Sequence, residues 1–454
     1  MNQPELSGRR PPSRLVHLSP RGGREPLHQR WLRLFHSDPL FHNSVYLMLS
    51  TGTVSLLGFA FWIVNARLYS TVDIGFATAL ISVATLIGTF SLLGLNNALI
   101  RYLGGEAEKN RLINSACATV ALAATAIATV YVLGTWRLPR LAITRVTPAV
   151  GALIVAFSVM LALYLLLESI FIAYRSTVFI LIKNAAQAVV KLGLTVTLVS
   201  FGAFGIVGSF ALSLAAALSL SFFFLRRRFR YRPWPGPSVQ LLRGLARFSF
   251  GTYIGLFLFN LPALALPVVI VQALGPSAAA YFYMSTMMAN LLYVVPLATT
   301  QSLFAEGSFN PGQLQPQLRK ATRLIALLLT PGLLLLVLLG SHILLVFGPA
   351  YAAQGAALLQ LQGAAAAFAA INMIGAALMS IRKDIRKLVL NNLVGAAATM
   401  GLSLALMPAH QLTGVGWAWL LGQAITSALY ARDVWVDLSL SWLPRHSVAR
   451  SPSA

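Results

Sequence analysis

Long apolar runs, separated by short polar segments, fill the chain from residue 44 to residue 431. A helix that crosses a bilayer needs about 20 mostly apolar residues. The runs are continuous rather than alternating, which favours helices over the strands of a membrane barrel. We therefore predict an all-α polytopic membrane protein with twelve transmembrane helices. The predicted spans cover residues 44–66, 74–100, 112–134, 148–173, 178–201, 204–225, 248–274, 278–304, 322–347, 352–380, 387–408 and 412–431.

A basic segment divides these spans into two sets of six, and the two sets are related. Arg175 and Asn184 in the first set recur as Arg382 and Asn391 in the second, both at an offset of 207. Equivalent loops follow an even number of spans, so the repeat is parallel, about an axis along the membrane normal. We expect a basic disordered tail at 1–41, a first half at 42–225, a basic linker at 226–247, a second half at 248–431 and a second tail at 432–454.

The distribution of positive charge predicts the orientation. The chain has 34 Lys and Arg against 11 Asp and Glu, and only 10% of its residues are charged. If the spans alternate from a cytoplasmic amino terminus, 29 of the 34 cationic residues lie on the inner side, four lie on the outer side, and Lys191 lies within a span. The positive-inside rule therefore places both termini in the cytoplasm. Basic chains also bind nucleic acid, but these charges lie between apolar spans, so we expect no nucleic-acid partner.

The chain offers little for catalysis. Of its 11 carboxylates only Glu168 lies within a predicted span, so the membrane interior holds no carboxylate pair for acid–base work. The seven histidines have no metal-ligand spacing. The single cysteine, Cys117, excludes an intrachain disulfide, and no Gly-Lys dipeptide marks a P-loop. We expect a protein without catalytic residues, metal or cofactor, and therefore not an enzyme.

Three charged residues belong to the fourth and fifth predicted spans. Glu168 and Lys183 lie at similar depths across one hairpin, which predicts a structural ion pair between them. Lys191 is deeper, about 20 Å from the cytoplasmic end of its helix at a rise of 1.5 Å per residue. A lysine at that depth either snorkels or contacts backbone carbonyls, or it lies in a water-filled cavity and binds an anionic substrate. Both interpretations are open from the sequence.

Other polar residues are weaker candidates for substrate binding. Arg67 ends the first span at the outer face, and Arg101 ends the second at the inner face. They anchor helix ends at the interface or line the mouths of a cavity. Amides within spans most often join helices to one another. The amides that we select as candidate substrate contacts are Asn65, Asn97, Gln187, Asn260 and Asn290.

Residues 58–103 contain two patterns that resemble the polysaccharide-type, Wzx-like flippases of the multidrug/oligosaccharidyl-lipid/polysaccharide exporter superfamily. An Ala-Arg-x-x-Ser-x-x-x-x-Gly turn follows the first span, and a Gly-Leu-x-x-Ala-Leu-Ile-Arg segment ends the second. The matching residues are Ala66, Arg67, Ser70 and Gly75, followed by Gly94, Leu95, Ala98, Leu99, Ile100 and Arg101. The resemblance covers about residues 42–431. It implies two pseudo-symmetric six-helix halves around a central V-shaped cavity, and transport by alternating access.

The resemblance also implies a function. Such a flippase moves a polyprenyl-diphosphate-linked oligosaccharide from the inner to the outer leaflet of the bacterial inner membrane, for cell-surface polysaccharide synthesis. Lys191 would attract the diphosphate, with Arg67 and Arg101 near the two mouths. The implied partners are this lipid-linked glycan, membrane lipids, and a polysaccharide polymerase or glycosyltransferases. The alternatives are a drug or amphiphile exporter of the same superfamily, a membrane-embedded polymerase or ligase, and a non-transporting scaffold.

Overall fold

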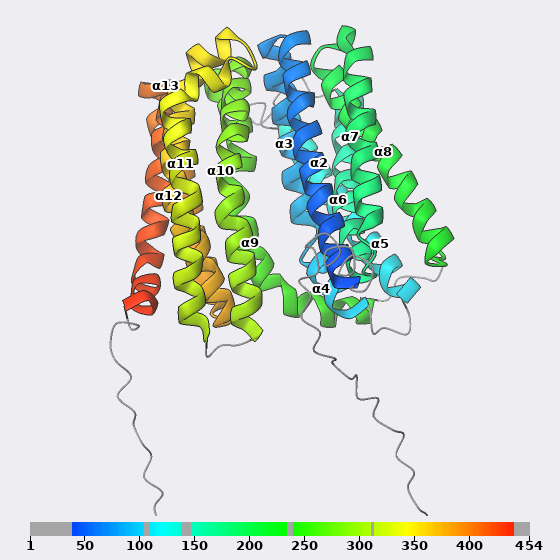
Figure 1. The fold of residues 1–454 in the computed structure, drawn as a ribbon. Helices are drawn as coiled ribbons and strands as arrows, with labels where there is room; N and C mark the ends of the chain where they lie inside the picture. The colour runs from blue at the N-terminus through cyan, green and yellow to red at the C-terminus, as the bar shows by residue number, and fades with distance from the viewer. Residues whose placement is uncertain (1–38, 104–108, 138–146, 234–238, 310–312, 440–454) are drawn as a thin grey trace, which may run out of the picture.

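A computed structural model describes residues 39–103, 109–137, 147–233, 239–309 and 313–439 (Figure 1). The regular structure in these ranges is entirely helical. The first half contains α2 (Pro39–Leu68), α3 (Thr71–Ser91), α4 (Leu95–Tyr102), α5 (Lys109–Arg137), α6 (Pro148–Ala173), α7 (Val178–Thr197), the short helix η3 (Val199–Phe201) and α8 (Ala203–Arg228). The second half contains α9 (Val239–Leu274), α10 (Pro276–Phe309), α11 (Leu314–Leu344), α12 (Pro349–Ile381) and α13 (Ile385–Ser439).

Eleven of these helices are long and apolar enough to cross a membrane. The last of them, α13, counts as two spans because Gln411 has non-helical backbone angles, φ 48° and ψ −131°. Twelve crossings result, as the sequence predicts. The second predicted span, 74–100, is not one helix. It breaks between α3 and α4, where Leu93 and Gly94 have φ of 50° and 79°, a region that a continuous helix does not visit.

Hydrogen bonds at the start of α3 join two distant helix ends. The Ser70 hydroxyl accepts from the Asp73 backbone N–H, which is the usual role of a serine N-cap. The Asp73 carboxylate accepts from the Ser70 hydroxyl and also from the backbone N–H of Ala203. Since Ala203 begins α8, one carboxylate satisfies donors at the amino-terminal ends of two helices.

The two halves repeat the same local structure, and the structure corrects the register of the repeat. The turn after α6 places Arg175 at φ 52°, and the turn after α12 places Lys383 at φ 59°. This pairing has an offset of 208 rather than the predicted 207. The counterpart of Asn184 is therefore Asn392 and not Asn391. The prediction was wrong because both turns adopt the left-handed conformation without a glycine, so no residue type marks the turn position.

The halves contact each other along α3, which packs against α9 and α10. We use "tail end" for the end of the bundle where the described chain begins and finishes, which is the lower end in Figure 1, and "far end" for the opposite one. At the far end a Cβ added to Gly75 would overlap the carbonyl of Pro276. Nearby, the hydroxyls of Thr71 and Ser277 lie 3.1 Å apart. The helix starts of α3 and α10 therefore cross at very short range.

Candidate functional site

α7 turns a polar face into the first half and an apolar face outward. Lys183, Gln187, Lys191 and Thr195 are buried and recur every four residues, so they lie along one face of the helix. The outward face carries exposed apolar residues such as Val189. The four buried residues form a polar stripe, which runs about 18 Å along the helix at 1.5 Å per residue. It contacts α2, α6 and α8, and its members have different partners at each level.

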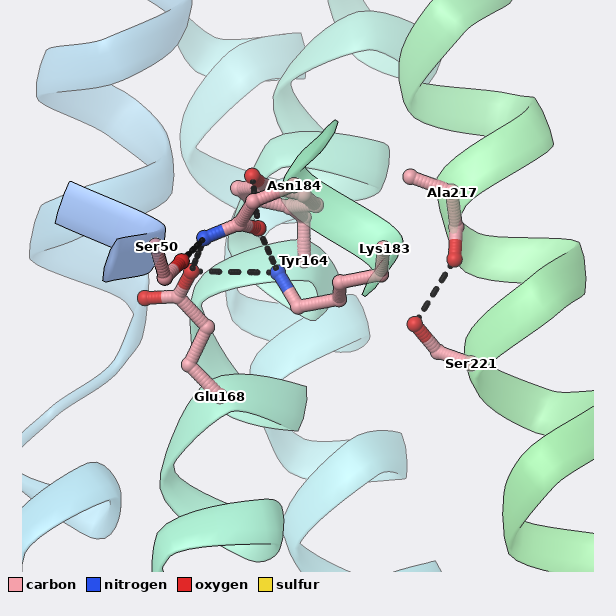
Figure 2. A network of polar contacts seen from close by, with 7 residues as sticks. All are labelled: Ser50, Tyr164, Glu168, Lys183, Asn184, Ala217 and Ser221. Atoms are coloured by element: carbon pink, nitrogen blue, oxygen red, sulfur yellow. Dashed lines mark hydrogen bonds and ion pairs between the residues drawn. The ribbon is translucent and has the colours of Figure 1, made fainter. Parts of the chain in front are cut away.

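The ion-pair cluster, our name for Ser50, Tyr164, Glu168, Lys183 and Asn184, forms the tail-end part of the stripe (Figure 2). Lys183 Nζ lies 3.1 Å from Glu168 Oε1 and 2.8 Å from Asn184 Oδ1. Asn184 Nδ2 donates to Glu168 Oε1 at 3.1 Å and to Ser50 Oγ at 3.0 Å. The Tyr164 hydroxyl donates to Asn184 Oδ1 at 2.6 Å.

This arrangement suits a structural role. The Lys183 side chain is fully buried, whereas the Glu168 side chain is 30% exposed. The ammonium also lies 3.3 Å from the centroid of the Tyr164 ring. Each polar group of the cluster has a partner, and the partners come from α2, α6 and α7. The structure thus brings together the two residues that we expected to pair, and adds Asn184, Tyr164 and Ser50 around them.

The lysine cage, our name for Lys191, Phe61 and Phe210, forms the middle of the stripe. Lys191 is 7% exposed. Its ammonium lies 4.6 Å from the ring centroid of Phe61 on α2 and 4.7 Å from that of Phe210 on α8. Both distances fall in the range of cation–π attraction. Within the described part of the chain, the Lys191 ammonium has neither a carboxylate nor a hydrogen-bond acceptor as a partner.

Two candidate amides flank the lysine cage and are already occupied. Gln187 Nε2 donates to Ser213 Oγ on α8 at 3.1 Å. Asn65 Nδ2 donates to the Phe61 carbonyl at 2.6 Å, and Asn65 Oδ1 accepts from Thr195 Oγ1 at 2.8 Å. Asn65 therefore joins α2 to α7, which is the common role of a buried amide in a membrane helix.

The remaining candidates lie elsewhere on the molecule. Arg67 is exposed at the far end, where its guanidinium donates to the second half. Arg101 and Asn97 are exposed on the short helix α4. Asn260 and Asn290 are exposed on α9 and α10. Of the predicted substrate contacts, only Lys191, Gln187 and Asn65 lie in one neighbourhood, and this neighbourhood is inside the first half.

The sequence does not distinguish the residues that hold Lys191. Phe61 and Phe210 are two of 25 phenylalanines and belong to no motif. A lysine within an apolar run does call for a partner, but the sequence alone cannot say which distant helix supplies it. Among the described residues, no three His, Cys, Asp or Glu side chains group as metal ligands.

Comparison with solved structures shows which fold this is. No protein-family profile and no curated protein sequence matches the chain. The structure described as "Lipid II flippase MurJ, inward closed conformation" matches with a TM-score of 0.71 and 12% identity, over 87% of this chain and 90% of that one. The MATE multidrug transporter DinF-BH matches with a TM-score of 0.64 and 15% identity, over 89% of this chain and 96% of that one.

The description of a third structural neighbour names the superfamily. An inward-facing multidrug resistance MATE family transporter of the MOP superfamily matches with a TM-score of 0.62 and 13% identity, over 88% of this chain and 95% of that one. At such identities the likeness establishes the fold alone. The likeness and the long apolar helices together show that the chain is a multi-pass membrane protein with the fold of MOP-superfamily transporters.

Proposed function

We propose that this protein is a flippase that carries a polyprenyl-diphosphate-linked oligosaccharide across the membrane by alternating access. The observation that carries the proposal is Lys191, a buried ammonium that has two aromatic rings around it and, among the residues that the structure describes, no counterion. A charge removed from water without a partner is unfavourable. An anionic head group that reached Lys191 would supply the missing partner.

The chemistry of the substrate explains why such a residue is needed. A diphosphate and a chain of sugar hydroxyls cannot cross hydrocarbon unaided, because both would lose their hydration. An ammonium forms strong charge-assisted hydrogen bonds with phosphate oxygens. Lys191 then binds the diphosphate within the membrane, while the polyprenyl tail stays in the lipid. Exposed Arg67 and Arg101 attract the head group at the two ends, and exposed amides such as Asn290 contact the sugars.

Location and partners follow from the same proposal. The excess of positive charge on one side of the predicted spans supports an orientation with both termini in the cytoplasm. A bacterial inner membrane is the place where such lipid-linked glycans are made and used. The enzymes that build the substrate and polymerise the product, glycosyltransferases and a polysaccharide polymerase, would then act on either side of the transport step.

Transbilayer movement in proteoliposomes tests the proposal. The probe is a fluorescent polyprenyl-diphosphate oligosaccharide, and the variants are Lys191→Arg, Lys191→Gln and Lys191→Met. We expect movement with the wild type and Lys191→Arg, and its loss with the two neutral variants. Lys320→Gln, which removes an exposed cation of α11, is the matched control and should move the probe normally. Equal movement with Lys191→Met would show that the buried cation has no role.

Export of amphiphilic drugs is the second candidate, because two structural neighbours are described as multidrug transporters. The aromatic rings around Lys191 could hold an organic cation only if the lysine left them. The described residues of α2 and α9 contain no carboxylate that would attract such a cation. The same proteoliposomes loaded with a cationic dye decide between the two: dye efflux without glycan movement would favour the exporter.

A further inference from the structure

In the described part of the chain, the Lys191 ammonium is held by the faces of the Phe61 and Phe210 rings. Phe61 is fully buried, and Phe210 is held edge-on by Phe157 at a centroid distance of 5.7 Å. The two cage rings are themselves 6.5 Å apart in an edge-to-face arrangement. Their orientation is therefore fixed by packing rather than by Lys191. Rings placed in this way form a ready site for one ammonium group.

An anion can displace the ammonium from these rings, because it offers hydrogen bonds that the rings cannot. Cation–π attraction leaves the three N–H donors of the ammonium without acceptors. A diphosphate would satisfy these donors with charge-assisted hydrogen bonds, which are among the strongest that a protein forms. By contrast, Lys183 on the same helix is bound to the Glu168 carboxylate and an amide oxygen. Of these two lysines, Lys191 is the one whose present partners an anion can outcompete.

The cage lies at a level where α2 contacts both the rest of the first half and the second half. Phe61 contacts Lys191 in the first half. The next residue, Trp62, contacts Tyr283 on α10 in the second half, with ring centroids 4.7 Å apart. Within its own half α2 packs mainly against α7. The ammonium therefore attaches α2 to the first half at the level where a neighbouring ring attaches it to the second.

We propose that the aromatic cage is an ammonium site that Lys191 occupies in the absence of substrate and leaves when the substrate's diphosphate binds to it. Departure of the ammonium removes one attachment of α2 to the first half and leaves the Trp62 contact with the second half in place. Head-group binding is thereby coupled to the position of α2. This inference rests on the proposed function, and it adds that Phe61 and Phe210 compete with the substrate for the same ammonium.

Competition predicts that damage to the cage strengthens substrate binding. In detergent solution, Phe210→Leu should bind farnesyl diphosphate about five- to thirtyfold more tightly than the wild type, the factor expected when one desolvated cation–π contact is lost. Phe222→Leu, on the same helix but outside the cage, is the matched control and should leave the affinity unchanged. Equal or weaker binding by a folded Phe210→Leu protein would overturn the proposal, since a merely structural ring cannot strengthen binding when it is removed.

A second experiment tests the cage without any substrate. Lys191→Ala vacates the site, so millimolar propylammonium chloride should raise the thermal unfolding temperature of this variant and not that of the wild type. Adding Phe210→Leu to the Lys191→Ala background should abolish the rise, and propanol should not produce it. No rise, or a rise that persists without Phe210, would overturn the cage. Failure of the wild type to bind or move any polyprenyl diphosphate would instead overturn the proposed function.

Discussion

In the first half Asn184 lies among charged side chains, and in the second half its counterpart Asn392 lies among neutral ones. Both amides join their helix to the first helix of their own half: Asn184 donates to Ser50 Oγ, and Asn392 donates to the Gly255 carbonyl at 2.9 Å. Each also accepts from a tyrosine hydroxyl, that of Tyr164 or that of Tyr430. The bond to the first helix is therefore common to both halves, whereas the tyrosines come from different helices, α6 in the first half and the last crossing, at the end of α13, in the second.

The two halves differ in the charged residues of these helices. At the offset of 208 that the structure establishes for these helices, the charged residues of the ion-pair cluster and the lysine cage have neutral counterparts in the second half. These counterparts are Ala376 for Glu168, Asn391 for Lys183 and Thr399 for Lys191. Because the second half builds the same arrangement of helices without these charges, the fold does not require them. The comparison separates residues that build a six-helix half from residues that give the first half a further property.

Removal of Glu168 should produce the largest effect, because it leaves the fully buried Lys183 without a counterion. We expect Glu168→Ala to lower the free energy of unfolding by about 3 kcal/mol. The matched change in the second half is Asp433→Ala, whose partner Lys387 is 37% exposed, and it should cost less than about 1 kcal/mol. Unfolding in mixed micelles measures both. Similar losses in the two halves would contradict the comparison.

Substitution of the equivalent amides should give unequal losses of intermediate size. Asn184→Ala removes hydrogen bonds to two charged groups as well as to two hydroxyls, and should cost about 2.5 kcal/mol. Asn392→Ala removes only neutral hydrogen bonds and should cost about 1.5 kcal/mol. The same unfolding assay applies. A larger loss for Asn392→Ala would mean that the charges of the first half do not add to the shared network.

A smaller effect is expected where the halves touch. The repeat has an offset of 205 in this earlier part of the chain, where α3 begins at Thr71 and α10 at Pro276, so Gly75 corresponds to Ala280. Gly75→Ala, which would give the two halves the same residue, places a methyl group on the Pro276 carbonyl and should cost about 1–2 kcal/mol. Gly58→Ala, which has open space around it, should instead stabilise α2 by up to about 1 kcal/mol. If Gly75→Ala also stabilised the protein, the close crossing would be absent in solution.

The smallest effect on stability should come from Lys191, although its effect on transport should be complete. Lys191→Met replaces an ion that has no counterion among the described residues with an apolar chain of similar length. Such replacements are often neutral, so we expect a change below about 1 kcal/mol in the free energy of unfolding. A large loss of stability would assign Lys191 to the fold and remove the distinction between it and Lys183.

The sequence predicts those features of this molecule that depend on residues close to one another along the chain. Twelve crossings follow from the length of apolar runs, because hydrocarbon thickness sets the length of each helix. The contact between Glu168 and Lys183 follows from the sequence because the two residues lie at similar distances from the short turn that joins α6 and α7. The register of the repeat does not follow, because Arg175 and Lys383 adopt left-handed conformations that residue type does not mark.

The environment of Lys191 is likewise beyond the sequence. Its two rings come from helices α2 and α8, and Phe61 lies 130 positions away along the chain. Nothing in the apolar pattern distinguishes a phenylalanine that faces this lysine from one that faces lipid. The sequence thus identifies a residue that needs a partner, and only tertiary packing decides whether this partner is an acid, an amide or a ring.

The contacts along α3 set the geometry of any movement between the halves. At the far end its Gly75 meets Pro276, and near the tail end its Thr89 carbonyl accepts from the hydroxyl of Tyr253. A rigid-body rotation that keeps both contacts must have its axis close to α3. Displacement grows with distance from such an axis, so helices far from α3 travel furthest. Pairs of spectroscopic labels for detecting rotation therefore belong on the rim of the molecule, and labels on α3 itself would scarcely move.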